Sequence, residues 1–447
     1  MKKKLYLCMP NQLTRTINKI HTNMKRLLLI FCMLLASHWI MAGEEFTIGD
    51  YSFEITSPTE VALSEVNRSI KSAHLPATVT YKGNTYTLTE ILEYALAHCY
   101  ELDSVTIPAT VTKISNHILM CSSPNSLVIE AGNPMFDSRD NCNAIIETRT
   151  NTLIEGCRSS TIPNGVTEIA GEAFYRCALL TSINIPASVT HIGEDAFRAC
   201  YMLESIEVDA ANTRYDSRDN CNAIIETQTN TLVVGCSGTV IPESVTSIGE
   251  YAYISNIEVA SHKSEHSYFL DTLFVIHIPK SVKSIGEHAF SRCSGITHIT
   301  ISNSITSIEL GAFYKCFGLK YITLPNYIKT IELSAFEWCE SLTTICIPDG
   351  VESIGESAFA ECHRLMSATI PQSVKTIGSW AFSSCFELNE ITYLGTKEQW
   401  SQVTLLEDWD ENSRIQVINC TDGKIKRQVP NKIDREYLYY MNPHNDY

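Results

Sequence analysis

The chain has 447 residues, 44% of them hydrophobic, and a formal net charge of −16 at pH 7. That length exceeds what one ordinary hydrophobic core supports, so the chain must form several domains or an array of repeats. An acidic protein repels phosphate backbones and anionic lipid, which argues against nucleic acid and anionic membranes as partners.

Residues 1–43 have the layout of a secretory signal peptide. They contain seven Lys and Arg residues, no acidic residue, and the apolar run Leu27 to Ala36. We expect cleavage after Ala42, where a small residue precedes an acidic start. Met24 is followed at once by two basic residues and the apolar run, so an over-extended start, with Met24 as the true first residue, is an alternative.

Removal of residues 1–43 lowers the formal charge from −16 to −23, because seven basic and no acidic residues are lost. The apolar run is too short for a confident spanning helix, so we expect no membrane span in the mature chain. A lipoprotein needs a Cys just behind the run, whereas Cys32 lies inside it. The sequence therefore predicts a protein that is secreted or held at the cell surface.

Residues 44–75 predict an N-terminal β cap. Apolar residues alternate with polar ones through Phe46, Phe53 and Ile55, the period of a strand with one buried face. An array of repeats needs such a cap because its first layer has no neighbour on one side.

A 23-residue period runs through residues 76–395. The step separates successive cysteines and prolines, and it is clearest at Cys293, Cys316, Cys339, Cys362 and Cys385. A fixed period in the twenties is the signature of a solenoid. We count about ten units from these landmarks.

Each unit has a strand and a buried turn. In the unit from Leu179 to Cys200, an L-x-x-I-x-I pattern predicts a short strand that turns Ile183 and Ile185 inward. Pro186 ends that strand because proline donates no backbone hydrogen bond. The Ala-Phe pair and Cys200 then form a buried elbow, which the next unit covers.

Fifteen of the seventeen cysteines remain after removal of the signal. In an exported protein this number suggests disulfides. One thiol per layer in a regular column offers no natural pairing scheme, so we favour small, buried, reduced cysteines. Disulfides between layers are the alternative.

Two units are longer than the rest. The string DSRDNCNAIIET at Asp137 to Thr148 recurs at Asp216 to Thr227, followed each time by a Thr-Asn-Thr turn. We predict two β-hairpins inserted as excursions from the solenoid. Clustered Asp and Asn oxygens could bind calcium, but the Arg among them and the acid spacing favour a turn.

The unit from Tyr251 to Phe274 lacks the Cys, which puts regular stacking there in doubt. It contains His262, Glu265 and His266 in the H-x-x-E-H spacing of a metal-dependent hydrolase. No helical period surrounds them, so a solvated loop is the better interpretation. No other catalytic or cofactor motif is present, and we expect neither enzyme activity nor a cofactor or metal.

Residues 396–423 predict a C-terminal cap in which Trp400 and Trp409 seal the last layer. Residues 424–447 form a polar and aromatic tail without a period, for which we expect loose order.

Stacked strands place their outward side chains in parallel rows on one open face, the usual binding surface of a solenoid. The alternative is that Thr and Ser are simply good exposed strand residues. Tyr321, His298 and Met366 stand out because such side chains anchor partners. The candidate partner-binding face consists of His298, Thr300, Lys320, Tyr321, Thr323, Thr343, Thr344, Met366 and Thr369.

The units LTSINIPASVTHIGEDAFRAC and LTTICIPDGVESIGESAFAEC resemble the BspA-like leucine-rich repeats of secreted and surface proteins of Bacteroides-type anaerobes. The resemblance covers nearly the whole mature chain. It implies a β-rich solenoid with minor α content, a right-handed leucine-rich-repeat array with two hairpin insertions and β caps at both ends.

The resemblance also implies an adhesin-like interaction protein. Its partner would be a protein or glycan of the host or of neighbouring cells, bound by a monomer. The rival hypothesis is a structural scaffold of the cell envelope, docked by the tail.

Overall fold

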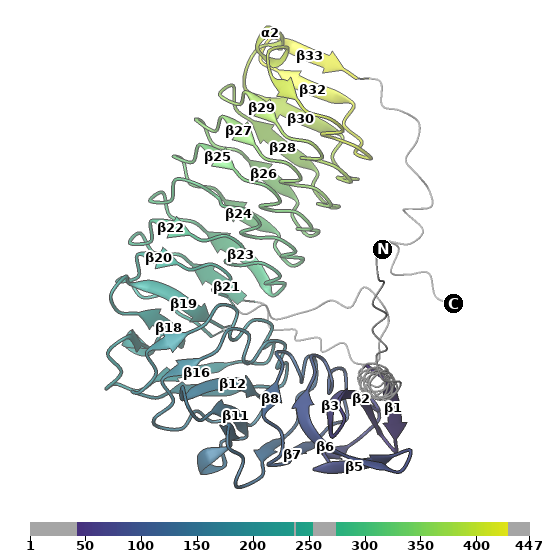
Figure 1. The fold of residues 1–447 in the computed structure, drawn as a ribbon. Helices are drawn as coiled ribbons and strands as arrows, with labels where there is room; N and C mark the ends of the chain where they lie inside the picture. Colours follow the sequence, from purple (N-terminus) through teal and green to yellow (C-terminus); the bar gives the residue numbers. More distant parts are fainter. Residues whose placement is uncertain (1–42, 237, 254–273, 428–447) are drawn as a thin grey trace, which may run out of the picture.

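The computed structural model describes residues 43–236, 238–253 and 274–427. They form a solenoid of about fifteen turns that bends into an arc (Figure 1). The described residues are β-rich, with one short helix, α2 (Lys397–Trp400), and two 3-10 turns, η1 (Arg139–Asn141) and η2 (Arg218–Asn220). The predicted fold class is confirmed, but the count of about ten units is too low, because caps and hairpins add turns that lack the Cys and Pro landmarks.

A mixed sheet, in which β3 and β6 pair in parallel and the other neighbours antiparallel, closes the N-terminal end. It contains β1 (Glu45–Ile48), β2 (Tyr51–Ser57), β3 (Glu60–Val66), β5 (Thr78–Tyr81) and β6 (Asn84–Ile91). The sheet thus includes strands on both sides of residue 75. Strand β6 also pairs in parallel with β8 (Lys113–Ile114), which joins the cap to the solenoid.

Two columns of parallel strands run along the solenoid, and Figure 1 shows the first along the inner side of the arc. The first column contains β4 (Ser72–His74), β7 (Ser104–Ile107), β9 (Ser126–Ile129), β14 (Ser182–Ile185), β16 (Ser205–Val208), β21 (Phe274–His277), β23 (Ile296–Thr300), β24 (Tyr321–Thr323), β26 (Thr344–Cys346), β28 (Ser367–Ile370), β30 (Glu390–Tyr393) and β32 (Val417–Cys420). These strands pair within four separate sheets. Within a sheet the buried side chains lie in line, as Ile183 does opposite Ile206 and Ile345 opposite Ala368.

The second column is made of two-residue strands on the other side of the core. After β8 it contains β13 (Glu168–Ile169), β15 (His191–Ile192), β20 (Ser247–Ile248), β22 (Ser284–Ile285), β25 (Thr330–Ile331), β27 (Ser353–Ile354), β29 (Thr376–Ile377) and β31 (Thr404–Leu405). In each of these strands from β13 to β29 the isoleucine is buried, as at Ile331 and Ile354, whereas both residues of β31 are exposed. The two columns therefore enclose an apolar core between them, in which three clusters of buried residues follow one another along the solenoid.

Both predicted hairpins are confirmed. The first comprises β10 (Phe136–Asp137), β11 (Ala144–Glu147) and β12 (Thr152–Gly156), and the second β17 (Tyr215–Asp216), β18 (Ala223–Glu226) and β19 (Thr231–Gly235). The prediction that they are excursions is wrong, because β12 pairs in parallel with β13 and β19 with β20. Their last strands occupy places in the second column, where the following short strand satisfies their backbone groups.

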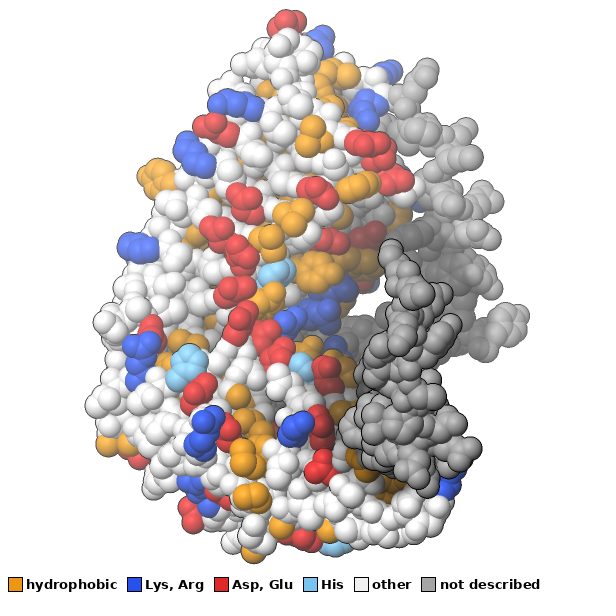
Figure 2. Space-filling view, in the orientation of Figure 1, with side chains coloured by type: hydrophobic (Ala, Val, Ile, Leu, Met, Phe, Trp, Pro, Cys, Tyr) orange, Lys and Arg blue, Asp and Glu red, His pale blue; other side chains and the backbone are white. Residues whose placement is uncertain are grey.

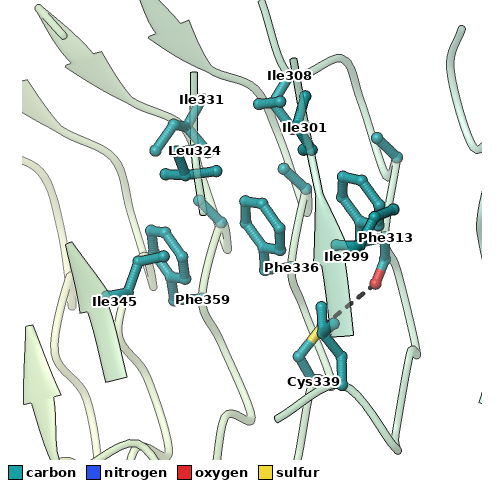
Figure 3. Packing of buried hydrophobic residues seen from close by; sticks show 14 of the residues in the cluster. Ile299, Ile301, Ile308, Phe313, Leu324, Ile331, Phe336, Cys339, Ile345 and Phe359 are labelled. Carbon is teal, nitrogen blue, oxygen red and sulfur yellow. Dashed lines mark hydrogen bonds between the residues drawn. The ribbon is translucent and has the colours of Figure 1, made fainter. Parts of the chain in front are cut away.

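A ladder of phenylalanine rings fills the elbows between the columns (Figure 3). The rings of Phe313, Phe336 and Phe359 are nearly parallel, with centroids 5.3 Å apart at each step. Beside them, the thiol of Cys339 donates a hydrogen bond to the Phe313 carbonyl oxygen at 3.3 Å. The cysteines of the column are buried free thiols, each hydrogen-bonded to the preceding layer from Cys316 to Cys385.

The backbone of each regular elbow contains two left-handed residues four positions apart. Ser334 and Trp338 have φ of +52° and +62°, although neither is glycine. Their N–H groups donate to the carbonyl oxygens of Glu356 and Ala360 in the next layer, both at 2.9 Å. Left-handed residues cost about 1 kcal/mol each, and these interlayer bonds offset that cost.

The C-terminal end is closed by the two tryptophans that the sequence indicated. Trp409 meets the last ring of the ladder, Phe382, edge-on at 89° with centroids 6.2 Å apart, and Trp400 is buried beside it. Strand β33 (Gly423–Lys426) pairs antiparallel with β32, so regular structure continues to Lys426. Three predicted features lie outside the described residues. They are the signal peptide up to residue 42, the motif from His262 to His266, and the tail at residues 428–447.

Candidate functional site

The predicted partner-binding face lies on the first strand column. The side chains of His298, Thr300, Lys320, Tyr321, Thr323, Thr344 and Met366 are exposed, whereas those of Thr343 and Thr369 are half-buried. Successive side chains of a strand point to opposite faces, which explains this exposure. Ile299 and Ile345, which each lie between outward-facing residues, point into the core.

Parallel pairing aligns the exposed side chains into rows. His298 lies opposite Tyr321 on the neighbouring strand, and their rings are 5.2 Å apart at 33°. In the next row Thr300 lies opposite Thr323, and further along the column Cys346 lies opposite Thr369. The strands therefore bring together the residues that the sequence grouped.

Sequence reasoning missed one member of the first row, Val275. It lies opposite His298, and its side chain is 69% exposed. Tyr321 and Met366 are 50% and 55% exposed on the same column. Strand β23 lies between Val275 and Tyr321, and β26 lies between Tyr321 and Met366. These three apolar side chains, spaced along the column, are here called the strand-face patch. The degenerate unit hid Val275, although the pattern V-I-H-I-P before the next unit marks it as an outward position.

A second surface, along the elbows, was also missed. The guanidinium of Arg198 lies 4.5 Å from the Tyr251 ring centroid, and the His288 ring stacks on the same tyrosine with centroids 4.9 Å apart. Further along, the Lys315 ammonium lies near the ring of Trp338. Figure 2 shows charged, histidine and apolar side chains intermixed across the middle of this face. The elbow positions vary from unit to unit, so the repeat pattern did not draw attention to them.

The Asp and Asn strings of the hairpins serve as turns. Arg139 holds Asp137 with two bonds, from Nε to Oδ1 at 2.8 Å and from Nη2 to Oδ2 at 2.6 Å, and also donates to Asn151. Arg218 repeats this arrangement with Asp216. Because Asp137 and Asp216 are already paired with arginine, each string offers little to a calcium ion. In the part of the chain that the structure describes, no group of three His, Cys, Asp or Glu side chains could hold a metal.

The sequence matches the family described as BspA type leucine-rich repeat region, in six copies, over residues 46–155, 145–268 and 264–389. No curated protein matches it. Across the described ranges, no helix has the length and apolar character needed to cross a bilayer.

Three solved structures resemble the chain. A leucine-rich repeat protein from Eubacterium ventriosum is 19% identical, with a TM-score of 0.54 over 86% of this chain and 100% of that one, a likeness that shows the fold. A leucine-rich cell surface protein from Faecalibacterium prausnitzii is 26% identical over 81% and 97% of the two chains, with a TM-score of 0.47. The pneumococcal vaccine antigen PcpA is 17% identical over 84% and 99%, with the same TM-score.

Proposed function

We propose that this chain, which belongs to the BspA-type leucine-rich-repeat family, is an exported or cell-surface interaction protein that binds a partner along its first strand column. The partner is a protein or glycan of the host or of neighbouring cells, and binding is adhesin-like, without a covalent step. The signal-like segment at residues 1–43 and the family support this proposal.

The strand-face patch carries the proposal. Val275, Tyr321 and Met366 are large apolar side chains that remain at least half exposed along the first strand column. Exposed aromatic and flexible apolar side chains are enriched at the centres of protein interfaces, where they lose water on binding. Lys320 adds a positive charge beside Tyr321 in an otherwise acidic protein.

The rows suit an extended partner. Neighbouring parallel strands lie about 4.8 Å apart, so the face repeats similar side chains at a short, fixed spacing. Each contact is weak, but contacts held on one rigid scaffold act together, which raises the overall affinity without any single deep pocket.

Surface binding tests this proposal. The mature protein is immobilised and exposed to purified mucin glycans and to extracellular-matrix proteins, and retained material is measured by biolayer interferometry. We expect the double variant Tyr321→Ser, Met366→Thr to lose at least tenfold in affinity, because about 2 kcal/mol or more is typical for central aromatic contacts.

Val240→Thr is the matched control. Val240 is 72% exposed but lies outside the strand columns, so its replacement should change affinity less than twofold. Equal losses in both variants, or no retained protein or glycan, would contradict the proposal. Surface proteolysis of intact cells tests the location separately, because an exported surface protein is cleaved while the cells remain whole.

A further inference from the structure

The two hairpin units share one architecture but differ at one buried position. Glu155 in strand β12 corresponds to Val234 in strand β19, since the adjacent glycines, Gly156 and Gly235, make the same backbone bond to the alanine of the next elbow. Each hairpin end thus takes the place of an elbow in the stack. The N–H groups of the preceding elbow therefore lack the carbonyl acceptors that a regular layer would supply.

In the first hairpin unit, a carboxyl group replaces the missing carbonyl. The side chain of Glu155 is 8% exposed and accepts hydrogen bonds from the backbone N–H groups of Ile118 and Leu119 in the preceding elbow. In regular layers the corresponding donation goes to the next layer, as from Phe313 N–H to the Ala335 carbonyl oxygen at 2.9 Å.

In the second unit, the same place is a cavity. Ala196 and Phe197 correspond to Ile118 and Leu119, since the elbows share left-handed residues just before them, at Asp195 and His117. The N–H of Ala196 makes only a turn bond of 3.3 Å, and among the described residues Phe197 N–H has no interlayer acceptor. Beside them is a cavity of about 120 Å³, lined by Ile192, Ala196, Phe197, Val233 and Val234 among others.

We propose that this cavity, here called the Val234 cavity, binds a short aliphatic carboxyl group, the group that Glu155 supplies from within the chain in the first hairpin unit. The Glu155 side chain is chemically a propionic acid attached to the backbone. Propionate, or the side chain of a glutamate in a partner polypeptide, presents the same atoms from outside. The carboxyl oxygens accept from Phe197 N–H, and the carbon chain contacts the apolar wall.

The size and the lining of the cavity fit this ligand. One water molecule has a share of about 30 Å³ in the liquid, so 120 Å³ accommodates an acid of a few heavy atoms. Ile192, Val233 and Val234 form an apolar wall beside the donors. Apolar walls with a few placed polar groups are the usual composition of a small-ligand site.

The charges at the mouth set a modest affinity. Arg198 lies in the lining and is paired with Asp195 at 2.7 Å, so these two groups largely cancel. Glu194 and Glu250 also line the cavity and oppose an anion, but both are exposed, where water and salt screen them. We therefore expect a Kd of about 1 mM for propionate.

The test uses the full mature protein and ¹³C-labelled propionate, followed by NMR line broadening and by the shift of the melting temperature. We expect saturable binding of one propionate. The same titration with 1-propanol, which has the carbon chain but no carboxyl group, should show none. Capped glutamate and capped glutamine amino acids distinguish the source, because glutamate alone should bind if a polypeptide side chain is accepted.

Two variants locate the site. Val234→Glu supplies the carboxyl group internally and should abolish propionate binding while the protein remains folded. Glu155→Val opens a second cavity and should raise the stoichiometry to two. Binding that survives in Val234→Glu, binding of 1-propanol equal to that of propionate, or no saturable binding would overturn the proposal, the last meaning that the cavity holds only water. None of these results depends on the strand-face patch.

Discussion

The array of residues 274–427 and the half of the chain that contains the hairpins differ in how they fill one core. From Phe290 to Phe382 each layer repeats the same ring contact at 5.3 Å and the same orientation of interlayer hydrogen bonds. Across each hairpin the ring ladder breaks. Phe174, for instance, packs on Gly156, where a Cβ would lie 2.1 Å from its ring.

In the periodic array, one set of core contacts and hydrogen bonds serves every layer. Where the period is interrupted, particular residues must fill the core and satisfy the backbone groups instead. Gly156 makes room for a ring, and buried Glu155 replaces a backbone acceptor. In the degenerate unit Tyr253 takes the place of phenylalanine, with its centroid 4.7 Å from that of Phe290, but its buried hydroxyl has no partner among the described residues. Interruptions are therefore where polar groups enter the core.

The largest expected effect comes from breaking the regular ladder. Phe336→Ala should lower the free energy of unfolding by about 4 kcal/mol, because the ring is fully buried between two others and leaves a cavity. Urea denaturation followed by circular dichroism measures the loss. Met366→Ala, at an exposed site, is the control, and a loss below about 1 kcal/mol for Phe336→Ala would mean that the stack relaxes around the gap.

A smaller effect should come from the buried acid of the first hairpin unit. Burial raises the pKa of Glu155 from 4.5 to about 8, while the backbone N–H groups of Leu119 and Ile118 oppose the shift. The folded chain thus holds a proton that the unfolded chain releases. The stabilising contribution is fully present below pH 4.5 and is lost as the pH rises to about 8.

Glu155→Gln tests this pH dependence, since it keeps the volume and the acceptor but cannot ionise. Relative to the wild type, the variant should gain on the order of 3 kcal/mol between pH 5 and pH 8. Thermal unfolding at several pH values gives the comparison. Parallel stability curves for the two proteins would show that Glu155 is ionised, or solvated, in the folded chain.

Removing a column thiol should cost less. Cys339→Ala loses one hydrogen bond to the Phe313 carbonyl and one sulfur atom, so about 1 kcal/mol is expected. Cys339→Ser should cost less than that, because Ser122 already occupies the corresponding position in an early unit and donates to the Leu96 carbonyl at 2.7 Å. Chemical denaturation of the two variants ranks them, and a larger loss for serine would contradict the comparison.

The smallest effect on stability is expected from alkylation of the exposed thiol, although the thiols should differ clearly in reactivity. Burial raises the pKa of the Cys339 and Cys385 thiols well above the ordinary value, whereas Cys346 is exposed on the strand face. Iodoacetamide at pH 7.5 should therefore modify Cys346 first without changing the melting temperature. Mass spectrometry of peptides identifies the order, and early modification of Cys339 would show that the ladder opens.

The sequence was sufficient for the period, the hairpins and the buried cysteine column, because each recurs and because strands and buried turns leave regular apolar patterns. It was not sufficient for Glu155, which reads as an exposed acid until its place is compared with Val234 in the second copy. Val275 was hidden by the same irregular unit that placed Tyr253 in the ladder. The backbone donors that decide the role of Glu155 leave no mark in the residue types.

The left-handed elbows give the array a direction. In the regular array, the interlayer hydrogen bonds of each elbow run from its N–H groups to the layer that follows, so an elbow is fully bonded only when its C-terminal neighbour is present. The last elbow is served by the cap, where Phe382 and Ser384 donate to the carbonyl oxygens of Trp409 and Glu411, both at 2.8 Å. Loss of the C-terminal cap would leave the N–H groups of the last elbow without acceptors, and loss of that layer would do the same to the layer before it. Unfolding of the solenoid would therefore advance from the C-terminal end toward the N-terminal sheet.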